Sequence, residues 1–145
     1  MLFRSMEFGE LLKQFLIDLQ SLFRIQLKQL NLTLPQIMLI SSIPIDGIDM
    51  SSLSKKLGVD NSTLTRLVDI LVKNQITEKT PNSSDKRSII LLLTKKGELL
   101  QLKIEEEIDL FVSALYQKIP IENREELKES LSSFHWIVSK HKLNI

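Results

Sequence analysis

Hydrophobic residues recur at helical spacing near both ends of the chain. From about Ser5 to Leu30, from Lys95 to about Lys118 and from Glu122 to about Lys140, apolar side chains mostly fall three or four residues apart. This period places them on one helical face, so we predict three amphipathic helices. Their stripes are Phe8, Leu12, Phe15, Leu19, Leu22 and Leu30, then Leu100, Ile104, Ile108, Phe111, Leu115 and Ile119, then Leu127, Leu131, Phe134 and Val138. One chain has little mass left to cover three stripes, so we expect a second chain to bury them.

Two short helices are predicted after the first long one. Thr33 and Gln36 have the spacing of a capping box, and the helix that they begin runs to about Ile43. A second short helix covers Ser51 to Leu57. It is followed by Gly58, and glycine readily adopts the left-handed conformation found at helix ends.

A further helix, from Asn61 to about Asn74, carries the main candidates for function. Asp60 is a plausible N-cap for it. Its core face consists of Leu64, Leu67, Val68 and Leu71. Its candidate contact residues are Asn61, Ser62, Thr63, Thr65 and Arg66. The residues that lie off the core stripe are Ser62, Thr63, Thr65, Arg66 and Asp69. We therefore expect one apolar face and one exposed face rich in hydroxyl groups.

Two short β-like runs follow, from Gln75 to Thr80 and from Ser88 to Leu93. The segment between them, Pro81 to Arg87, contains only turn-forming and charged residues. This pattern predicts a β-hairpin. Its loop is longer than a tight turn requires, and such excess length commonly serves binding. Thr94 is placed to cap the helix that begins at Lys95.

Composition narrows the class of protein. The chain has 145 residues, of which 43% are hydrophobic, enough for one domain with a real core. It has no cysteine, so disulfides, cysteine-ligated zinc and thiol redox sensing are excluded. No apolar run approaches the roughly 18 residues of a membrane span, and the N-terminus does not resemble a signal peptide. We therefore expect a cytoplasmic protein with no membrane partner.

Charge is distributed unevenly along the chain. The formal net charge is only +1. Nine basic and four acidic residues fall between Ser51 and Lys96, which gives that segment a charge of +5 and leaves −4 for the rest. A basic centre between acidic ends indicates a polyanionic partner.

Duplex DNA fits this arrangement. One helix fills the major groove, about 12 Å wide, and Arg66 has the length and fork geometry to contact a guanine edge. Lys86 and Arg87 at the hairpin tip are candidates for the narrower minor groove. The candidate phosphate contacts are Ser52, Lys55 and Lys56 on the preceding short helix.

Four segments together resemble the MarR family of winged-helix transcriptional regulators. They are Leu53–Asp60, Ser62–Leu71, Asp85–Arg87 and the Leu-Thr-x-x-Gly motif Leu93–Gly97. The resemblance implies a mainly α-helical fold with a small β-hairpin, in which a winged helix-turn-helix region (33–97) and a helical dimerisation region (1–32 and 98–145) form one integrated domain. Ser54 departs from the alanine usual in the family, and the family's peroxide sensors need a cysteine that this chain lacks.

The resemblance also implies roles for residues and partners. It implies a homodimer that represses transcription from a pseudo-palindromic operator, with Arg66 as the contact arginine and Arg87 in the minor groove, oriented by Asp85. It further implies a small aromatic or phenolic effector. The expected dimer interface consists of Phe8, Leu12, Phe15, Leu19, Phe111, Leu115, Leu131, Phe134 and Val138.

Two other classes of function can be compared with the sequence. A winged-helix module that binds protein rather than DNA is the main alternative, and salt-sensitive binding to duplex DNA would distinguish the two. An enzyme finds no support, because the chain has no paired carboxylates, nucleophile elbow or phosphate-binding glycine loop. His135 and His141 do not share a helical face, so we predict no metal, cofactor or catalytic residue.

Overall fold

The computed structural model describes residues 2–85 and 87–145, with side chains from residue 7 onward. The chain separates into two compact units, the first ending at Ile108 and the second comprising Asp109–Ile145. The first unit contains α1 (Leu2–Gln26), η1 (Lys28–Leu30), α2 (Leu34–Ser41), β1 (Ile48–Asp49), α3 (Met50–Leu57), α4 (Asn61–Lys73), β2 (Thr77–Pro81), β3 (Ile89–Leu93) and the start of α5 (Lys95–Gln117). The second unit contains the end of α5, η2 (Ile121–Asn123) and α6 (Arg124–Leu143).

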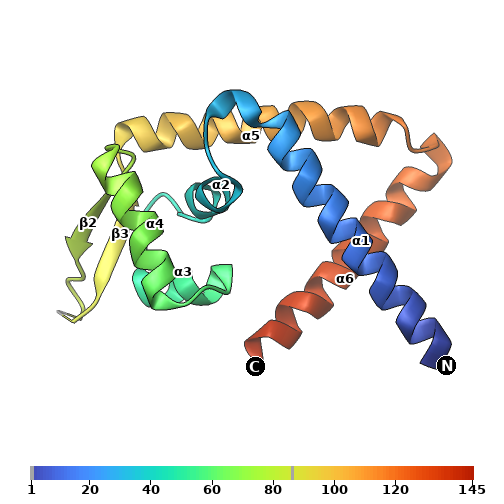
Figure 1. Cartoon of the computed structure of the whole chain (residues 1–145), viewed down its shortest axis with the longest axis horizontal. Helices are drawn as coiled ribbons and strands as arrows, with labels where there is room; N and C mark the ends of the chain where they lie inside the picture. Colours follow the sequence, from blue (N-terminus) through green and yellow to red (C-terminus); the bar gives the residue numbers. More distant parts are fainter. Residues whose placement is uncertain (1, 86) are drawn as a thin grey trace. The chain divides into compact units, whose positions relative to one another are not determined.

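Residues 33–97 form a lobe of three short helices and a small sheet, which we call the winged lobe (Figure 1). The sheet is antiparallel with strand order β1-β3-β2, and β3 pairs with both neighbours. The core of the lobe draws on every helix and on the central strand. Its buried side chains include Ile37, Leu39, Ile40, Leu53, Leu64, Val68, Leu71 and Leu91. The predicted core face of α4 is confirmed at three of its four positions, and Leu67 is half-buried.

The predicted helix ends of the lobe are confirmed. Thr33 and Gln36 form the capping box, with the Gln36 N–H donating to the Thr33 hydroxyl and the Thr33 N–H donating to the Gln36 amide oxygen. The Asp60 carboxylate accepts the Thr63 N–H at 2.7 Å and so caps α4. Gly58 ends α3 with φ of 68°, a conformation that a side chain disfavours.

The sheet differs from the expectation in having a third strand. Ile48 and Asp49 pair with Leu91 and Ile90, which adds β1 to the predicted hairpin. Two residues are too few to show a β period, so the pairing depends on contacts with a distant strand. The first long helix also ends earlier than expected, at Gln26, and a short 3₁₀ turn follows it.

The Leu-Thr-x-x-Gly motif joins the hairpin to α5. Thr94 donates its hydroxyl proton to the carbonyl oxygens of Gln75 and Ile76 at 2.6 and 3.1 Å and accepts the Gly97 N–H at 3.0 Å. A Cβ at position 97 would overlap the Ile76 carbonyl oxygen. The motif therefore fixes the start of α5 against the end of the α4–β2 connection, and only glycine fits there.

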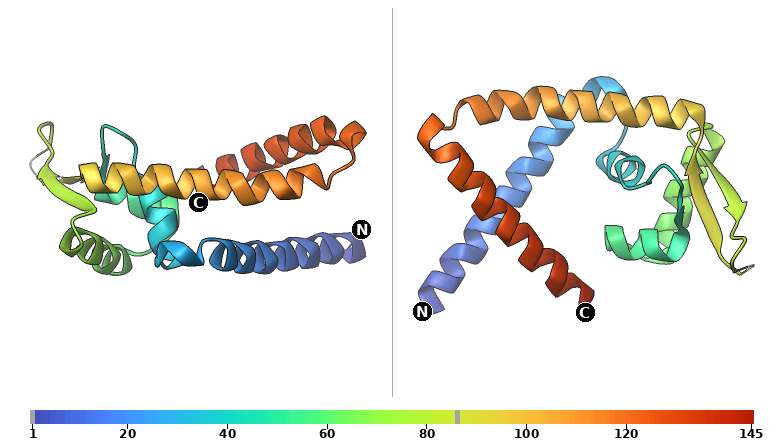
Figure 2. Two further views of the ribbon diagram at one scale, coloured as in Figure 1. Left: turned by 90° about the horizontal axis from the view of Figure 1, so that it is seen from above. Right: turned by 180° about the vertical axis from the view of Figure 1, so that it is seen from behind.

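The described apolar side chains of α1 and α6 are exposed or half-buried. Both views show α1 running away from α2–α4 (Figures 1 and 2). Among the side chains that the structure describes, none on α1 or α6 is buried. Of the expected dimer residues, Phe8, Leu12, Phe15, Leu115, Leu131 and Val138 are exposed, and Leu19 and Phe134 are half-buried. Phe111 differs from the rest because it is only 8% exposed within a single chain.

Candidate nucleic-acid interface

The outer face of α4 carries the predicted contact residues. Asn61, Ser62, Thr65 and Arg66 are exposed, and Thr63 is half-buried. Within the described part of the chain Arg66 has no ion pair. The opposite face of the helix is buried in the lobe, so α4 presents a polar edge on a rigid support.

Asp60 organises the first turn of α4. Its carboxylate accepts the Ser62 hydroxyl proton at 2.9 Å as well as the Thr63 N–H. These hydrogen bonds lower the pKa of Asp60, with the Thr63 backbone N–H contributing most and Arg66 adding a smaller coulombic effect. The carboxylate is therefore ionised at neutral pH, and it holds the Ser62 hydroxyl in one orientation.

An open cavity of about 430 Å³ brings the helix and the hairpin together. Its lining consists of Met50, Ser51, Asn61, Leu64, Thr65, Lys79, Arg87, Ser88 and Ile89. Two predicted residues of α4 and one predicted residue of the hairpin thus share one hollow, although they lie more than 20 residues apart in the sequence. The fold therefore places these predicted residues of the helix and of the hairpin on one side of the lobe.

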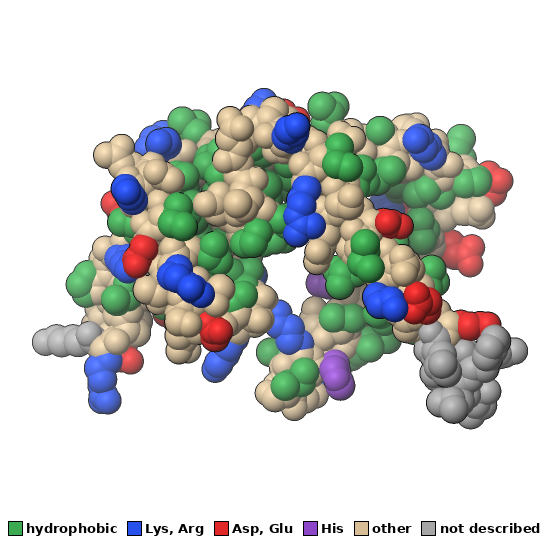
Figure 3. All heavy atoms as spheres, in the orientation of Figure 1, with side chains coloured by type: hydrophobic (Ala, Val, Ile, Leu, Met, Phe, Trp, Pro, Cys, Tyr) green, Lys and Arg blue, Asp and Glu red, His purple; other side chains and the backbone are tan. Residues whose placement is uncertain are grey.

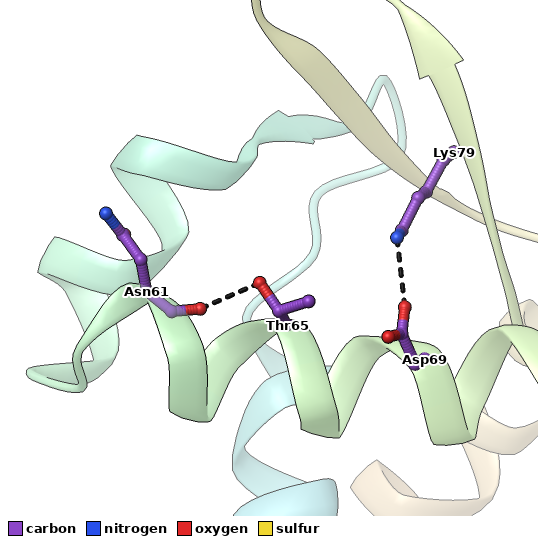
Figure 4. Close-up of polar contacts among 4 residues, drawn as sticks. All are labelled: Asn61, Thr65, Asp69 and Lys79. Atoms are coloured by element: carbon purple, nitrogen blue, oxygen red, sulfur yellow. Dashed lines mark hydrogen bonds and ion pairs between the residues drawn. The ribbon is translucent and has the colours of Figure 1, made fainter.

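Lys79 is a residue of this region that the sequence reasoning missed. From β2 it reaches Asp69 on α4 and forms an ion pair at 3.0 Å (Figure 4). Asp69 was identified only as lying off the core stripe of its helix. Alternation along β2 gave no signal for Lys79, because the partner lies on a different element.

The hairpin loop is held by local hydrogen bonds. Asp85 accepts the Arg87 backbone N–H at 3.0 Å, so its carboxylate fixes the backbone at Arg87. Asn82 donates to the Ser88 hydroxyl at 2.8 Å and accepts the Ser84 N–H at 3.0 Å. Arg87 is exposed. Lys86, the other predicted cation of the loop, lies outside the described residues.

The three candidate phosphate contacts on α3 differ in their surroundings. Ser52 gives both its N–H and its hydroxyl proton to Asp49, the N-cap of α3, at 2.8 and 2.7 Å. These bonds lower the pKa of Asp49, with the Ser52 hydroxyl as the largest cause. Lys56 donates to the Ser42 carbonyl oxygen at 3.1 Å, and Lys55 is exposed. Lys55 is thus the best placed of the three to contact a phosphate.

Basic side chains are spread over the surface of the winged lobe (Figure 3). In the described part of the chain, no group of three or more His, Cys, Asp or Glu residues could hold a metal ion. No helix among those residues has both the length and the hydropathy of a membrane span.

Comparisons with known proteins give this arrangement a family context. Residues 32–89 match the model of the MarR family. An HTH-type transcriptional regulator of Bacillus subtilis, YhbI, is 27% identical over 115 residues, which cover 79% of this chain and 75% of that protein. The multiple antibiotic resistance protein MarR of Salmonella typhimurium is 38% identical over 72 residues, about half of each chain.

A solved structure extends the similarity to nearly the whole chain. It is a cysteine-to-serine mutant of E. coli MarR in complex with operator DNA, 25% identical, with a TM-score of 0.75 and coverage of 90% of this chain and 95% of that chain. The matched family segment contains α2–α4, β2 and the loop after it with its Asp-x-Arg sequence, and it ends at the first residue of β3. The expected fold is confirmed, and the chain is similar to MarR-family transcriptional regulators in sequence over residues 32–89 and in fold over nearly its whole length.

Proposed function

We propose that the protein binds duplex DNA with α4 in the major groove and the β2–β3 hairpin over the adjacent minor groove. The observation that carries this proposal is the cavity shared by Asn61, Thr65 and Arg87, which puts helix and hairpin residues on one side of the lobe. Arg66 is exposed beside them and can form the two parallel hydrogen bonds that select guanine. The similar E. coli protein was solved in complex with operator DNA, which supports DNA binding by this chain.

The proposal includes a homodimer. The exposed apolar residues of α1 and α6 are more numerous than a monomer in water would be expected to leave uncovered. A second copy is the occupant that a family of dimeric regulators suggests. Two-fold symmetry then predicts a pseudo-palindromic operator with half-sites about 10 base pairs apart.

The proposal also assigns the sign and the control of regulation. We infer that the dimer acts as a repressor and is released from DNA by a small aromatic or phenolic molecule. A ligand that binds the DNA-free form more tightly must lower the affinity for DNA. By linkage, DNA lowers the affinity for that ligand by the same factor. Titration of DNA binding across a panel of phenolic acids tests this, and equal DNA affinity throughout the panel would contradict it.

The test of DNA binding uses fluorescence anisotropy with a labelled duplex at rising salt. We expect the parent to bind with an affinity that falls steeply as the salt concentration rises. The reason is that the protein's basic side chains release counterions from the DNA phosphates, and this release is less favourable at high salt. The double variant Arg66→Ala/Arg87→Ala should lose most of this binding. The matched control Arg24→Ala/Lys118→Ala removes the same charge away from the proposed interface and should bind like the parent.

A winged-helix module that binds protein is the alternative. It predicts no binding to duplex DNA at low salt, or equal losses in the two double variants. Either result would reject the DNA interface.

A further inference from the structure

Two hydroxyl groups on the outer face of α4 donate their protons in hydrogen bonds within the chain. The Ser62 hydroxyl donates to the Asp60 carboxylate at 2.9 Å. The Thr65 hydroxyl donates to the Asn61 carbonyl oxygen at 2.8 Å, as Figure 4 shows. A hydroxyl has one proton and two lone pairs. Toward a ligand, both groups therefore present an acceptor and no donor.

The Asp60 carboxylate is a stable hydrogen-bond acceptor for the Ser62 hydroxyl. That carboxylate also accepts the Thr63 N–H, and its pKa lies below the usual range, so it stays ionised and attractive to the hydroxyl proton. Thr65 is fixed differently, because its acceptor is a main-chain carbonyl of the same helix, one turn earlier. Neither arrangement depends on a distant part of the chain.

Asp69 continues the same edge of the helix. Asn61, Thr65 and Asp69 are spaced by four residues and so lie in one row, which Figure 4 shows along α4. The Asp69 side chain is 59% exposed, and its Oδ1 atom is paired with Lys79. A carboxylate has about four lone-pair sites, so it remains an acceptor while the lysine offsets its charge beside the DNA phosphates.

Arg66 is the contrasting group on this face. A guanidinium has five N–H donors and no acceptor. The outer face of α4 thus combines acceptors at positions 62, 65 and 69 with one strong donor at position 66. The Asn61 amide can serve in either role.

We propose that α4 recognises base amino groups, the adenine N6 or cytosine N4 group, through Ser62 and Thr65, while Arg66 recognises guanine. This inference rests on the proposed DNA binding and adds the chemistry of its half-site. In the major groove the amino groups are the only hydrogen-bond donors that bases present, so an acceptor on the helix selects adenine or cytosine. Asp69 disfavours base edges that carry only hydrogen-bond acceptors, because neither the carboxylate nor such an edge can donate a proton to the other.

The experiment begins with selection of preferred sequences from random duplexes by the parent protein. Each adenine of the preferred half-site is then replaced by purine, which lacks the 6-amino group, and each cytosine by 2-pyrimidinone, which lacks the 4-amino group. In parallel, purines are replaced by 7-deaza analogues, which lack the N7 acceptor. Affinities are measured for the parent, Ser62→Ala, Thr65→Val and Thr65→Ser.

We expect removal of at least one amino group to weaken binding by the parent about tenfold, as for the loss of a hydrogen bond that leaves a buried acceptor unpaired. The same removal should cost Thr65→Val or Ser62→Ala nothing further. Thr65→Ser keeps the oxygen and should behave like the parent. It also serves as a check on folding, because it removes only a methyl group.

Two results would overturn the inference, and they differ in what else they reject. In the first, the parent binds with unchanged affinity after every amino group is removed. In addition, 7-deaza substitutions weaken binding by the parent but not by Ser62→Ala or Thr65→Val. Together these results would show that the hydroxyls act as donors. In that case the proposed DNA binding would stand. A selection that returns no preferred sequence would reject the proposed sequence-specific function and this inference together.

Discussion

The winged lobe and the terminal helices differ in whether their large hydrophobic side chains are buried within one chain. In the lobe, α2, α3, α4 and β3 all contribute side chains that are almost fully buried within one chain. On α1 and α6 no described side chain is buried, although both helices have several apolar residues. The lobe thus has its own core, whereas the terminal helices have apolar surface that a second copy would complete. In the proposed function, this difference separates the part that would contact DNA from the part that would fix the spacing between two such contacts.

The largest expected effect is in the core of the lobe. Leu64→Ala removes a side chain that is 1% exposed, and we expect the free energy of unfolding to fall by about 2–5 kcal/mol. The loss should be similar at every protein concentration, because the contacts lie within one chain. Ile45, which is 90% exposed, supplies the control, and Ile45→Ala should change stability by less than about 0.5 kcal/mol.

The comparison is sharpened by a charge on the exposed helix. Leu131 on α6 is 57% exposed in the single chain. We expect Leu131→Glu to convert the dimer to monomer in sedimentation experiments, and to weaken binding to a two-half-site operator by about a hundredfold through loss of bivalence. The fold measured by circular dichroism should be retained. Ile45→Glu adds the same charge elsewhere and should leave both properties unchanged, so a dimeric Leu131→Glu protein would break the comparison.

Arg66 tests specificity within the lobe. We expect Arg66→Ala to cost about 1–3 kcal/mol on the preferred operator and to relax the preference for guanine at one position. The reason is that the variant lacks the guanidinium and so loses two proposed hydrogen bonds to guanine. No other described side chain on this face supplies them. Arg24→Ala on α1 is the control. An unchanged affinity for the preferred operator in a titration of Arg66→Ala would remove this arginine from the interface.

The smallest effect is expected at the hairpin. Arg87→Ala should weaken binding to all sequences alike and reduce the slope of log affinity against log salt by about one unit. This pattern separates a phosphate or minor-groove contact from one that selects a base. If the slopes of parent and variant coincide, the hairpin does not contact the DNA backbone.

Much of the lobe could be predicted from the sequence because its signals are local. The caps at Thr33 and Asp60 and the glycine at 58 each work within a few residues, and each is confirmed. The missed strand at Ile48–Asp49 and the missed partner Lys79 depend on pairing between distant segments. The apolar stripes were visible in the sequence. The burial of Phe111 within one chain was not, because a stripe does not specify which neighbour covers it.

The candidate site shows the same limit. Residue types and spacing identified the outer face of α4 and the arginine of the loop. They did not show that Ser52 is engaged by Asp49 or that Lys56 is bonded to the end of α2. These partners decide which hydrogen-bonding groups remain for DNA, and they follow from three-dimensional geometry.

A hydroxyl-radical footprint on the selected operator tests the central claim most directly. We predict two protected tracts, related by two-fold symmetry and centred about 10 base pairs apart, because two copies present α4 to successive major grooves on one side of the duplex. A single tract, or uniform cleavage at saturating protein, would contradict the account.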